Sequence, residues 1–245
     1  MTDRETETRA RGSLSDRWGP TLDAAMPWSP PPRRTIVLAP HPDDESLSSG
    51  GLVALQRARG LEVVVVAVTD GEAAYDPDGD DHLASRRRAE QCSALRVLGV
   101  DQSAIERLGV PDGRVAESED AVRDRLEKLL RPGDLLVTTW NRDVHPDHEA
   151  CGRASVDAVR AIPATLVFSL FWTWHHRLAN EIDRRHLLAL ELDVATQATK
   201  RRAIRRHASQ FRSPGEDDPI LDERIAEPAS WSCEYFLAAQ PEEWS

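Results

Sequence analysis

Short apolar runs alternate with longer amphipathic stretches along most of the chain, from residue 35 onward. The runs are rich in branched aliphatic side chains, as in strands that are covered on both faces. They predict strands at residues 36–39, 62–69, 105–108, 135–140 and 166–171. The stretches between them predict helices at residues 47–59, 82–98, 120–130, 147–161 and 194–210. Because strands separated by helices of this length indicate βαβ units, we expect an α/β protein, a Rossmann-like three-layer sandwich with a mostly parallel sheet.

The first 33 residues stand outside this alternation. Residues 1–17 are mostly charged and polar, which indicates a mobile tail. Trp18 and Trp28 follow, and we expect these indoles to hold the segment against the rest of the protein. We therefore predict an N-terminal arm over residues 1–33, mobile or packed on the surface, and a single domain over residues 34–245.

The overall charge narrows the class of partner. The formal net charge is −11, which argues against a nucleic-acid backbone or an anionic membrane surface. No apolar stretch approaches the roughly 20 residues that a membrane span needs, and the N-terminus lacks the apolar core of a signal peptide. The cysteines are odd in number and far apart, which indicates reduced thiols in a cytoplasmic protein. The oligomeric state cannot be read from the sequence.

A dense polar cluster follows the first predicted strand. Pro40 ends the strand, and His41, Asp43, Asp44 and Glu45 come directly after it. In an open parallel sheet, ligands bind outside the carboxyl ends of the strands. Burying these groups without partners would cost several kcal/mol, by order of magnitude. A bound metal ion would offset that cost.

A second cluster repeats this pattern after the strand at residues 135–140, with His145, Asp147 and His148 opening a helix. Because parallel strands end at the same edge, the two clusters are expected to converge. His41, Asp44 and His148 then supply two imidazoles and one carboxylate, which leaves a zinc position open for water. Asp43, beside these ligands, is placed to act as a general base. The simpler interpretation, two polar turns with helix caps, leaves the paired histidines unexplained.

These residues carry a resemblance to a known family. Residues 40–45 (PHPDDE) and 145–148 (HPDH) resemble the two signature motifs of the PIG-L/LmbE-like zinc N-deacetylases. Further matches lie at Arg87-x-x-Glu90, at residues 108–113 and at residues 200–210. The resemblance covers roughly residues 34–212, in the right order and at plausible spacing.

The resemblance implies a single metal ion, usually Zn²⁺, on His41, Asp44 and His148. A set of two imidazoles and a carboxylate also suits Fe²⁺ or Co²⁺. The resemblance further implies that Asp43 deprotonates the attacking water and later protonates the leaving amine. His145 would then be a cation that stabilises the oxyanion, with its pKa raised by a neighbouring acid such as Asp147.

The family match also implies residues around this centre. Arg87 and Asp112 match positions that contact the sugar of the substrate, and Glu45 is expected to brace the site from behind. One position departs from the pattern of some members, because Asp143 stands where they carry a mobile tyrosine. Arg142 or a tryptophan is expected to shape that wall instead. Trp172 and Trp174 follow the strand at residues 166–171, so we expect indole stacking on the substrate there.

Together these features predict a zinc-dependent hydrolase of linear amide bonds. We expect it to remove acetyl from a small-molecule amino sugar of the N-acetylglucosamine type, as a glycoside or a glycoconjugate. An amidase of the same family that cleaves a larger amide, such as a thiol conjugate of an amino sugar, is the nearest alternative. A metal-dependent phosphoesterase lacks phosphate-cradling glycines here, a dinucleotide enzyme lacks GxGxxG, and a non-catalytic binding module would not need Asp43.

Overall fold

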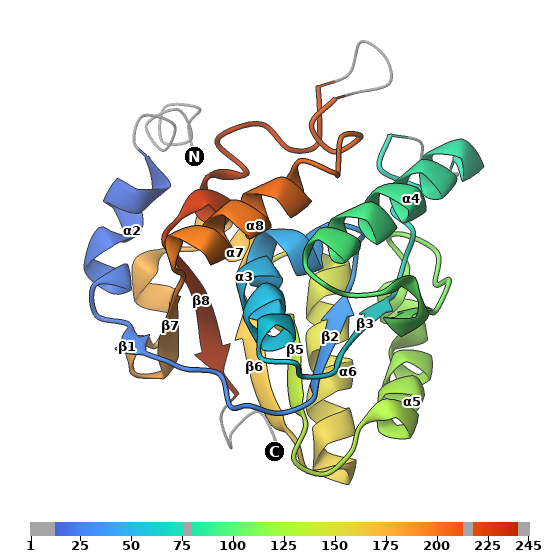
Figure 1. Cartoon of the computed structure of the whole chain (residues 1–245), viewed down its shortest axis with the longest axis horizontal. Coiled ribbons are helices and arrows are strands. Elements are labelled where there is room, and N and C mark those ends of the chain that lie inside the picture. The colour runs from blue at the N-terminus through green and yellow to red at the C-terminus, as the bar shows by residue number, and fades with distance from the viewer. Residues whose placement is uncertain (1–12, 76–79, 213–217, 240–245) are drawn as a thin grey trace, which may run out of the picture.

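A computed structural model describes residues 13–75, 80–212 and 218–239 of the chain. They contain an eight-stranded sheet in the order β1-β7-β8-β6-β5-β2-β3-β4 (Figure 1). The strands are β1 (Met26–Pro27), β2 (Thr35–Ala39), β3 (Val63–Ala67), β4 (Ile105–Arg107), β5 (Leu135–Thr139), β6 (Thr165–Ser169), β7 (Leu187–Glu191) and β8 (Cys233–Ala238). Only β8 pairs antiparallel with its neighbours, β6 and β7. The prediction of a mostly parallel sheet is confirmed.

Helices cover both faces of this sheet (Figure 1). They are α2 (Leu14–Leu22), α3 (Asp44–Ala58), α4 (Asp81–Val97), α5 (Glu119–Leu129), α6 (Pro146–Ala161), α7 (Trp172–His176) and α8 (Val194–Ile204). Alternate residues of β2 serve the two faces: Ile36 and Leu38 join a core with α5 and α6, whereas Val37 and Ala39 join a core with α3, α4 and α8. The predicted three-layer sandwich is therefore confirmed.

The register of the central strands aligns the two polar clusters. Strand β2 pairs in parallel with β5, and Val37 lies opposite Val137. Both strands are buried along their whole length, as the apolar run at residues 36–39 predicted for β2. The loops that leave their carboxyl ends, at residues 40–43 and 140–145, therefore start side by side at one edge of the sheet.

Several boundaries differ from the predictions. Helix α3 begins at Asp44, three residues before the expected start, so part of the first polar cluster lies in its first turn. Helix α8 ends at Ile204 rather than at residue 210. Strands β1, β7 and β8 were not predicted, because β1 is very short and a buried glutamate interrupts the apolar run of β8.

The N-terminal arm is more ordered than its composition indicated. The expectation of a mobile tail is wrong for residues 14–17, which belong to α2, while residues 1–12 lie outside the described part of the chain. Trp18 is fully buried and meets Trp174 edge-on, with ring centroids 5.0 Å apart. Trp28 packs on Phe236 of β8. The expected role of both indoles agrees with these contacts, and the division at residue 33 stays a prediction.

Within the described residues, none of the helices has the length and apolar character needed to cross a membrane. The cysteines Cys92, Cys151 and Cys233 are all free thiols.

A buried ion pair joins β8 to the helices on one face. The Glu234 carboxylate accepts a bond from Lys200 Nζ of α8 at 2.8 Å, and both side chains are at most 3% exposed. The same carboxylate accepts the backbone N–H groups of Gly51 and Leu52 in α3, at 2.6 and 2.8 Å. A Cβ at Gly51 would lie 2.6 Å from Leu192 and 3.0 Å from this carboxyl group, so glycine permits the approach. Glu234 thus fixes the helix that presents the first polar cluster.

Replacing Glu234 should destabilise the fold strongly. Glu234→Gln leaves Lys200 buried without its counter-charge, so we expect the free energy of unfolding to fall by about 3–5 kcal/mol. Urea unfolding followed by circular dichroism measures this difference. Glu191→Gln is the matched control, since Glu191 is exposed on the adjacent strand β7, and it should stay within about 0.5 kcal/mol of wild type. Equal stability of the two variants would contradict the assigned role of Glu234.

Candidate active site

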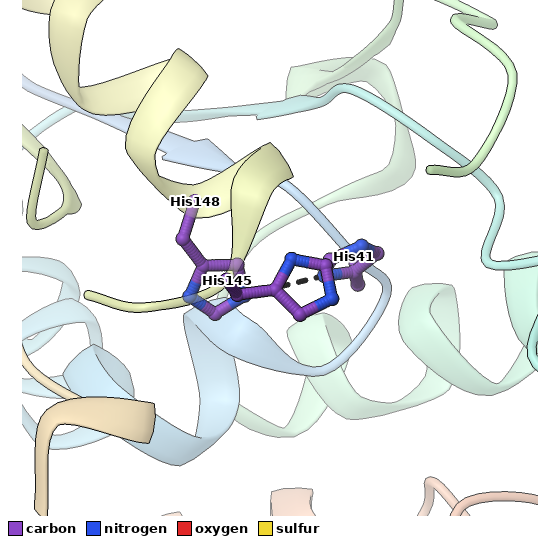
Figure 2. A group of neighbouring side chains, drawn as sticks. All are labelled: His41, His145 and His148. Carbon is purple, nitrogen blue, oxygen red and sulfur yellow. Dashed lines mark hydrogen bonds between the residues drawn. The ribbon is translucent and has the colours of Figure 1, made fainter. Parts of the chain in front are cut away.

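Three histidines from the two loops face one another where β2 and β5 end. Figure 2 shows His41 from the loop after β2, His145 from the loop before α6, and His148 in the first turn of α6, with their rings pointing together. The ring centroids of His145 lie 4.8 Å from those of both His41 and His148. The predicted convergence of the two clusters is therefore present in the structure.

The three predicted metal ligands form an equilateral triangle of donor atoms. His41 Nδ1 lies 3.3 Å from Asp44 Oδ2 and 3.3 Å from His148 Nε2, and Asp44 Oδ2 lies 3.3 Å from His148 Nε2. Tetrahedral zinc with bonds of about 2.0–2.1 Å separates its ligand atoms by about 3.3–3.4 Å. The donor set thus fits one tetrahedral metal ion with its fourth position open.

The alternative donor set, the imidazoles of His41, His145 and His148, is looser. His41, His145 and His148 place ligand atoms within 4.8 Å of one another, which is wider than the 3.3 Å triangle. The His145 Nδ1 atom also accepts the backbone N–H of Asp147 at 3.3 Å, which occupies that nitrogen. We therefore favour Asp44 over His145 as the third donor.

Carboxylates hold the outer nitrogen of His41. Its Nε2 lies 3.2 Å from Asp112 Oδ1 and 3.3 Å from Asp147 Oδ2. Asp147 also accepts the backbone N–H groups of Gly113 and Val115, at 2.8 and 3.1 Å. Burial lowers the pKa of His41, but these carboxylates and Asp44 outweigh burial and hold that pKa well above its ordinary value. This arrangement turns Nδ1 toward the triangle, as outer carboxylates do in metal sites.

The carboxylate of Asp112 is engaged within the protein, with one oxygen toward His41. Its second oxygen accepts the backbone N–H of Ala73 at 3.1 Å, so both oxygens have partners. The expected contact of Asp112 with a sugar stays a prediction.

His148 is held by a residue that the sequence analysis did not assign to the site. Asp143 is fully buried, and its Oδ2 accepts a hydrogen bond from His148 Nδ1 at 2.7 Å. Burial lowers the pKa of His148, but Asp44 and Asp143 outweigh it and raise that pKa to about 9. Between Asp143 and His145, Val144 has a φ of 75°, a left-handed conformation that costs a β-branched residue about 1–3 kcal/mol. The only sequence signal for this role of Asp143 was that it stands where some family members carry a tyrosine.

Asp43 is a buried carboxyl group that does not cap the helix it precedes. It occupies the N-cap position of α3, yet its side chain makes no capping bond, which weakens the interpretation of the cluster as a helix cap. Burial first, and then the charge of Asp44, raise the pKa of Asp43 to about 7. A carboxyl group with such a pKa can take and return a proton near neutrality.

His145 differs from expectation in its charge. Burial first, and then the charges of His41 and His148, lower its pKa to about 4. The expected rise caused by Asp147 is wrong, because that carboxylate is turned toward His41 and its attraction on His145 is outweighed. With Nδ1 accepting a backbone N–H, the neutral ring carries its proton on Nε2. His145 is therefore a neutral hydrogen-bond donor here, not a cation.

Glu45 lies behind the site in α3. It is 1% exposed and accepts bonds from Gln91 Nε2 and Ser46 Oγ, both at 3.1 Å. Burial raises its pKa to about 8. These contacts agree with the expected bracing role and place Glu45 outside the triangle of donor atoms.

A cavity of about 220 Å³ opens in front of the triangle. Its lining combines polar side chains, among them Asp43, His145 and Arg87, with apolar ones. The large apolar side chains of this lining are Phe171, Trp172, Ile220 and Leu221. Arg87 is 3% exposed, and its Nε and Nη2 atoms have no partner within the described part of the chain. Such unsatisfied buried donors are expected to meet a polar ligand.

Of the two tryptophans predicted to form the substrate wall, the structure places only Trp172 at the cavity. The prediction for Trp174 is wrong. Its side chain is 2% exposed, its Nε1 donates to the carbonyl of Leu170 at 2.8 Å, and its ring packs between those of Trp18 and Trp231. Because residues two apart on a helix point to nearly opposite sides, one indole reaches the cavity and the other fills the core.

A larger cavity, of about 650 Å³, lies between α8 and residues 223–230. Arg201, Arg205 and Arg212 line it over an apolar floor, and none of the described residues around it is a histidine. We assign the chemistry to the smaller cavity, because the titratable groups with shifted pKa values gather there.

Comparison with known proteins agrees with this geometry. The family model for PIG-L, described as GlcNAc-PI de-N-acetylase, matches residues 36–159, which include both histidine clusters but not α7. A probable N-acetyl-alpha-D-glucosaminyl L-malate deacetylase 2 of Bacillus subtilis is 33% identical over 135 residues, 51% of this chain and 59% of the relative. A 1D-myo-inositol 2-acetamido-2-deoxy-alpha-D-glucopyranoside deacetylase of Streptomyces griseus is 27% identical over 76% of this chain and 77% of the relative.

The fold has solved counterparts. The crystal structure of the conserved protein TT1542 from Thermus thermophilus superimposes with a TM-score of 0.62 and 28% identity, covering 84% of this chain and 94% of that protein. The chain spans less than two thirds of the length of the Bacillus subtilis relative. The family model, in contrast, accounts for half of the chain and for the whole triangle of donor atoms. On these grounds the chain belongs to the PIG-L family.

Proposed function

We propose that this protein is a metal-dependent hydrolase that removes the N-acetyl group from an N-acetylglucosamine-type amino sugar. The observation that carries this proposal is the triangle of three donor atoms 3.3 Å apart, beside a carboxyl group with a pKa of about 7. The names of the relatives, which are deacetylases of N-acetylglucosamine derivatives, support the substrate class.

His41, Asp44 and His148 would hold the metal ion, and we propose Zn²⁺, although Fe²⁺ and Co²⁺ suit the same donors. When bound, the ion supplies a Lewis acid for the amide carbonyl and lowers the pKa of water. The outer contacts of both imidazoles, with Asp112 and Asp147 on one and Asp143 on the other, support this assignment.

Asp43 and His145 would move and hold protons. Asp43 takes a proton from the attacking water, and the water oxygen forms a bond to the amide carbon. The same proton then passes from Asp43 to the amide nitrogen, the C–N bond breaks, and acetate and a free amine result. His145, with its proton on Nε2, donates a hydrogen bond to the carbonyl oxygen as negative charge develops on it.

The rest of the cavity suits one sugar unit. The free Nε and Nη2 groups of Arg87 are buried donors that sugar hydroxyls can satisfy. Trp172, which lines the same cavity, offers an indole on which a sugar ring can stack. The cytoplasmic location expected from the separate cysteines, and the absence of a nucleic-acid partner, stay predictions.

Loss of the base should abolish turnover without loss of metal. We expect Asp43→Asn to lower amine release from N-acetylglucosaminides about 10²–10⁴-fold, because a general base of this kind contributes that much. Free amine is measured with a fluorogenic amine reagent over a panel of glycosides, with a chelated sample beside it. The control Asp124→Asn changes an exposed acid on α5. If wild type binds metal but turns over no sugar in the panel, the larger-amide alternative replaces this proposal.

The two candidate donor sets predict different metal contents. After metal loading and dialysis, His41→Ala and His148→Ala should retain little metal, and His145→Ala should retain about one equivalent, as read by elemental analysis. This result is expected because His145 lies outside the 3.3 Å triangle. Metal loss in His145→Ala equal to that in His148→Ala would instead establish the three-imidazole set.

The buried arginine should matter for substrate more than its exposed neighbour. We expect Arg87→Met to lower kcat/KM about 10–100-fold, because hydrogen bonds from a charged group are worth roughly 1.5–3 kcal/mol. Arg86→Met, one residue earlier in α4 and exposed, should leave kcat/KM within about twofold. Steady-state kinetics on the best glycoside of the panel measure both values. Equal kinetics of the two variants would remove Arg87 from the substrate site.

A further inference from the structure

We propose that Asp143 is a positioning residue that ties the metal-binding imidazole of His148 to the aromatic wall of the cavity. This inference rests on the proposed function, because it concerns the ligand His148 and the substrate wall at Trp172. Asp143 itself does not line the cavity, and neither the family model nor the names of the relatives assign it a role.

The first tie is to His148. Asp143 Oδ2 lies 2.7 Å from His148 Nδ1, and both side chains are at most 1% exposed. His148 Nε2 points into the triangle of donor atoms, so this nitrogen must be free of a proton when it binds a metal ion. The proton of the neutral ring then resides on Nδ1. Asp143 accepts the hydrogen bond from this Nδ1–H group. The bond selects the tautomer of His148 and fixes the plane of its ring.

The second tie is to α7. Asp143 Oδ1 accepts the backbone N–H of Thr173 at 2.9 Å and its hydroxyl group as well. The N–H groups of Phe171 and Trp172 lie 3.3 Å from Oδ1 and Oδ2, respectively. The carboxyl group therefore satisfies the donors at the start of α7, which otherwise have no partner in the helix. It reaches them from a loop about 30 residues earlier in the sequence.

Both ties meet at one wall of the cavity. The start of α7 presents Trp172, whose ring lies nearly parallel to that of His145 at 6.5 Å. The middle of this short helix is held in the core, where the Trp174 carbonyl accepts a hydrogen bond from Trp18 Nε1 at 2.8 Å. Trp172 is thus placed between a core anchor and the Asp143 carboxyl group. A shift of Asp143 would move a metal ligand and the aromatic wall together.

Capping of α7 alone does not account for an aspartate at this position. Asparagine or serine can cap a helix about as well as aspartate. In contrast, asparagine cannot accept the His148 Nδ1 proton and the α7 donors with both of its terminal atoms, because its nitrogen only donates. An acid with two accepting oxygens is needed where an imidazole and a helix start converge.

Metal affinity measured by competition with a chromophoric chelator tests this role. We expect Asp143→Asn to bind Zn²⁺ about 10–100-fold more weakly than wild type, the usual effect of removing an outer partner of a ligating histidine. The matched control, Asp157→Asn, changes a half-exposed acid on the same helix α6 as His148 and should bind as wild type does. Affinity of Asp143→Asn equal to that of the control overturns the inference.

The aromatic side of the coupling has its own variant. Thr173→Val removes one donor to Asp143 on the α7 side and leaves the bond to His148. We expect it to raise KM for the glycoside, with the Zn²⁺ affinity within about threefold of wild type. Loss of Zn²⁺ affinity in Thr173→Val as large as that in Asp143→Asn would mean that the carboxyl group acts only by holding α7, which contradicts the first tie.

A measurement on wild type keeps the test valid if Asp143→Asn does not fold. In nitrogen-15 NMR of the Zn²⁺-loaded protein, His148 should be the Nδ1–H tautomer with a proton that exchanges slowly with water. An Nε2–H tautomer for His148 overturns the inference. If wild type itself binds no Zn²⁺, the proposed function fails instead, so the two failures are distinguishable.

Discussion

The parallel pairing of β2 with β5 is the constraint on which the rest of this molecule depends. The register places Val37 opposite Val137, so the two strands end together and release two polar loops at one edge. No local property of either loop could bring His41 to within 3.3 Å of His148, which is 107 residues away. Burial of the apolar strands stabilises the fold, and part of this stabilisation offsets the cost of keeping the charged groups of the loops out of water.

Electrostatics at this edge are arranged in layers. The donor atoms of His41, Asp44 and His148 form the inner layer, and acids on the outer nitrogens form the next. These carboxylates accept hydrogen bonds from the outer nitrogens of His41 and His148. The inner nitrogens of both rings therefore face the triangle of donor atoms. Burial also lowers the pKa values of His41 and His148, but there the carboxylates outweigh it. At Asp43 and His145 burial prevails, and it raises the pKa of Asp43 to about 7 and lowers that of His145 to about 4. One small volume thus holds two histidines of raised pKa and one of lowered pKa.

Much of this could be predicted from the sequence, for identifiable reasons. Strands β2, β3, β5 and β6 are largely apolar, and the two clusters follow β2 and β5, so local patterns sufficed there. Strand β8 escaped because Glu234 faces inward, and its cation, Lys200, comes from a distant helix. Asp143 was left unassigned and Trp174 was misassigned for the same physical reason: the contacts of Asp143 with α7, and of Trp174 with Trp18, join distant parts of the chain. The charge of His145 depends on which way Asp147 turns, which no linear pattern records.

The position of Glu234 has a consequence for the way the chain reaches its native state. Strand β8 inserts between β6 and β7, so the sheet is joined only when nearly the last described residues arrive. Until then, Lys200 has no counter-charge, and the middle of α3 lacks its buried acceptor. A partly synthesised chain that already carries both histidine motifs therefore still lacks Glu234, which fixes the helix that presents the first motif. Assembly of the edge that carries the histidines is therefore coupled to the insertion of β8, a strand that follows both motifs in the chain.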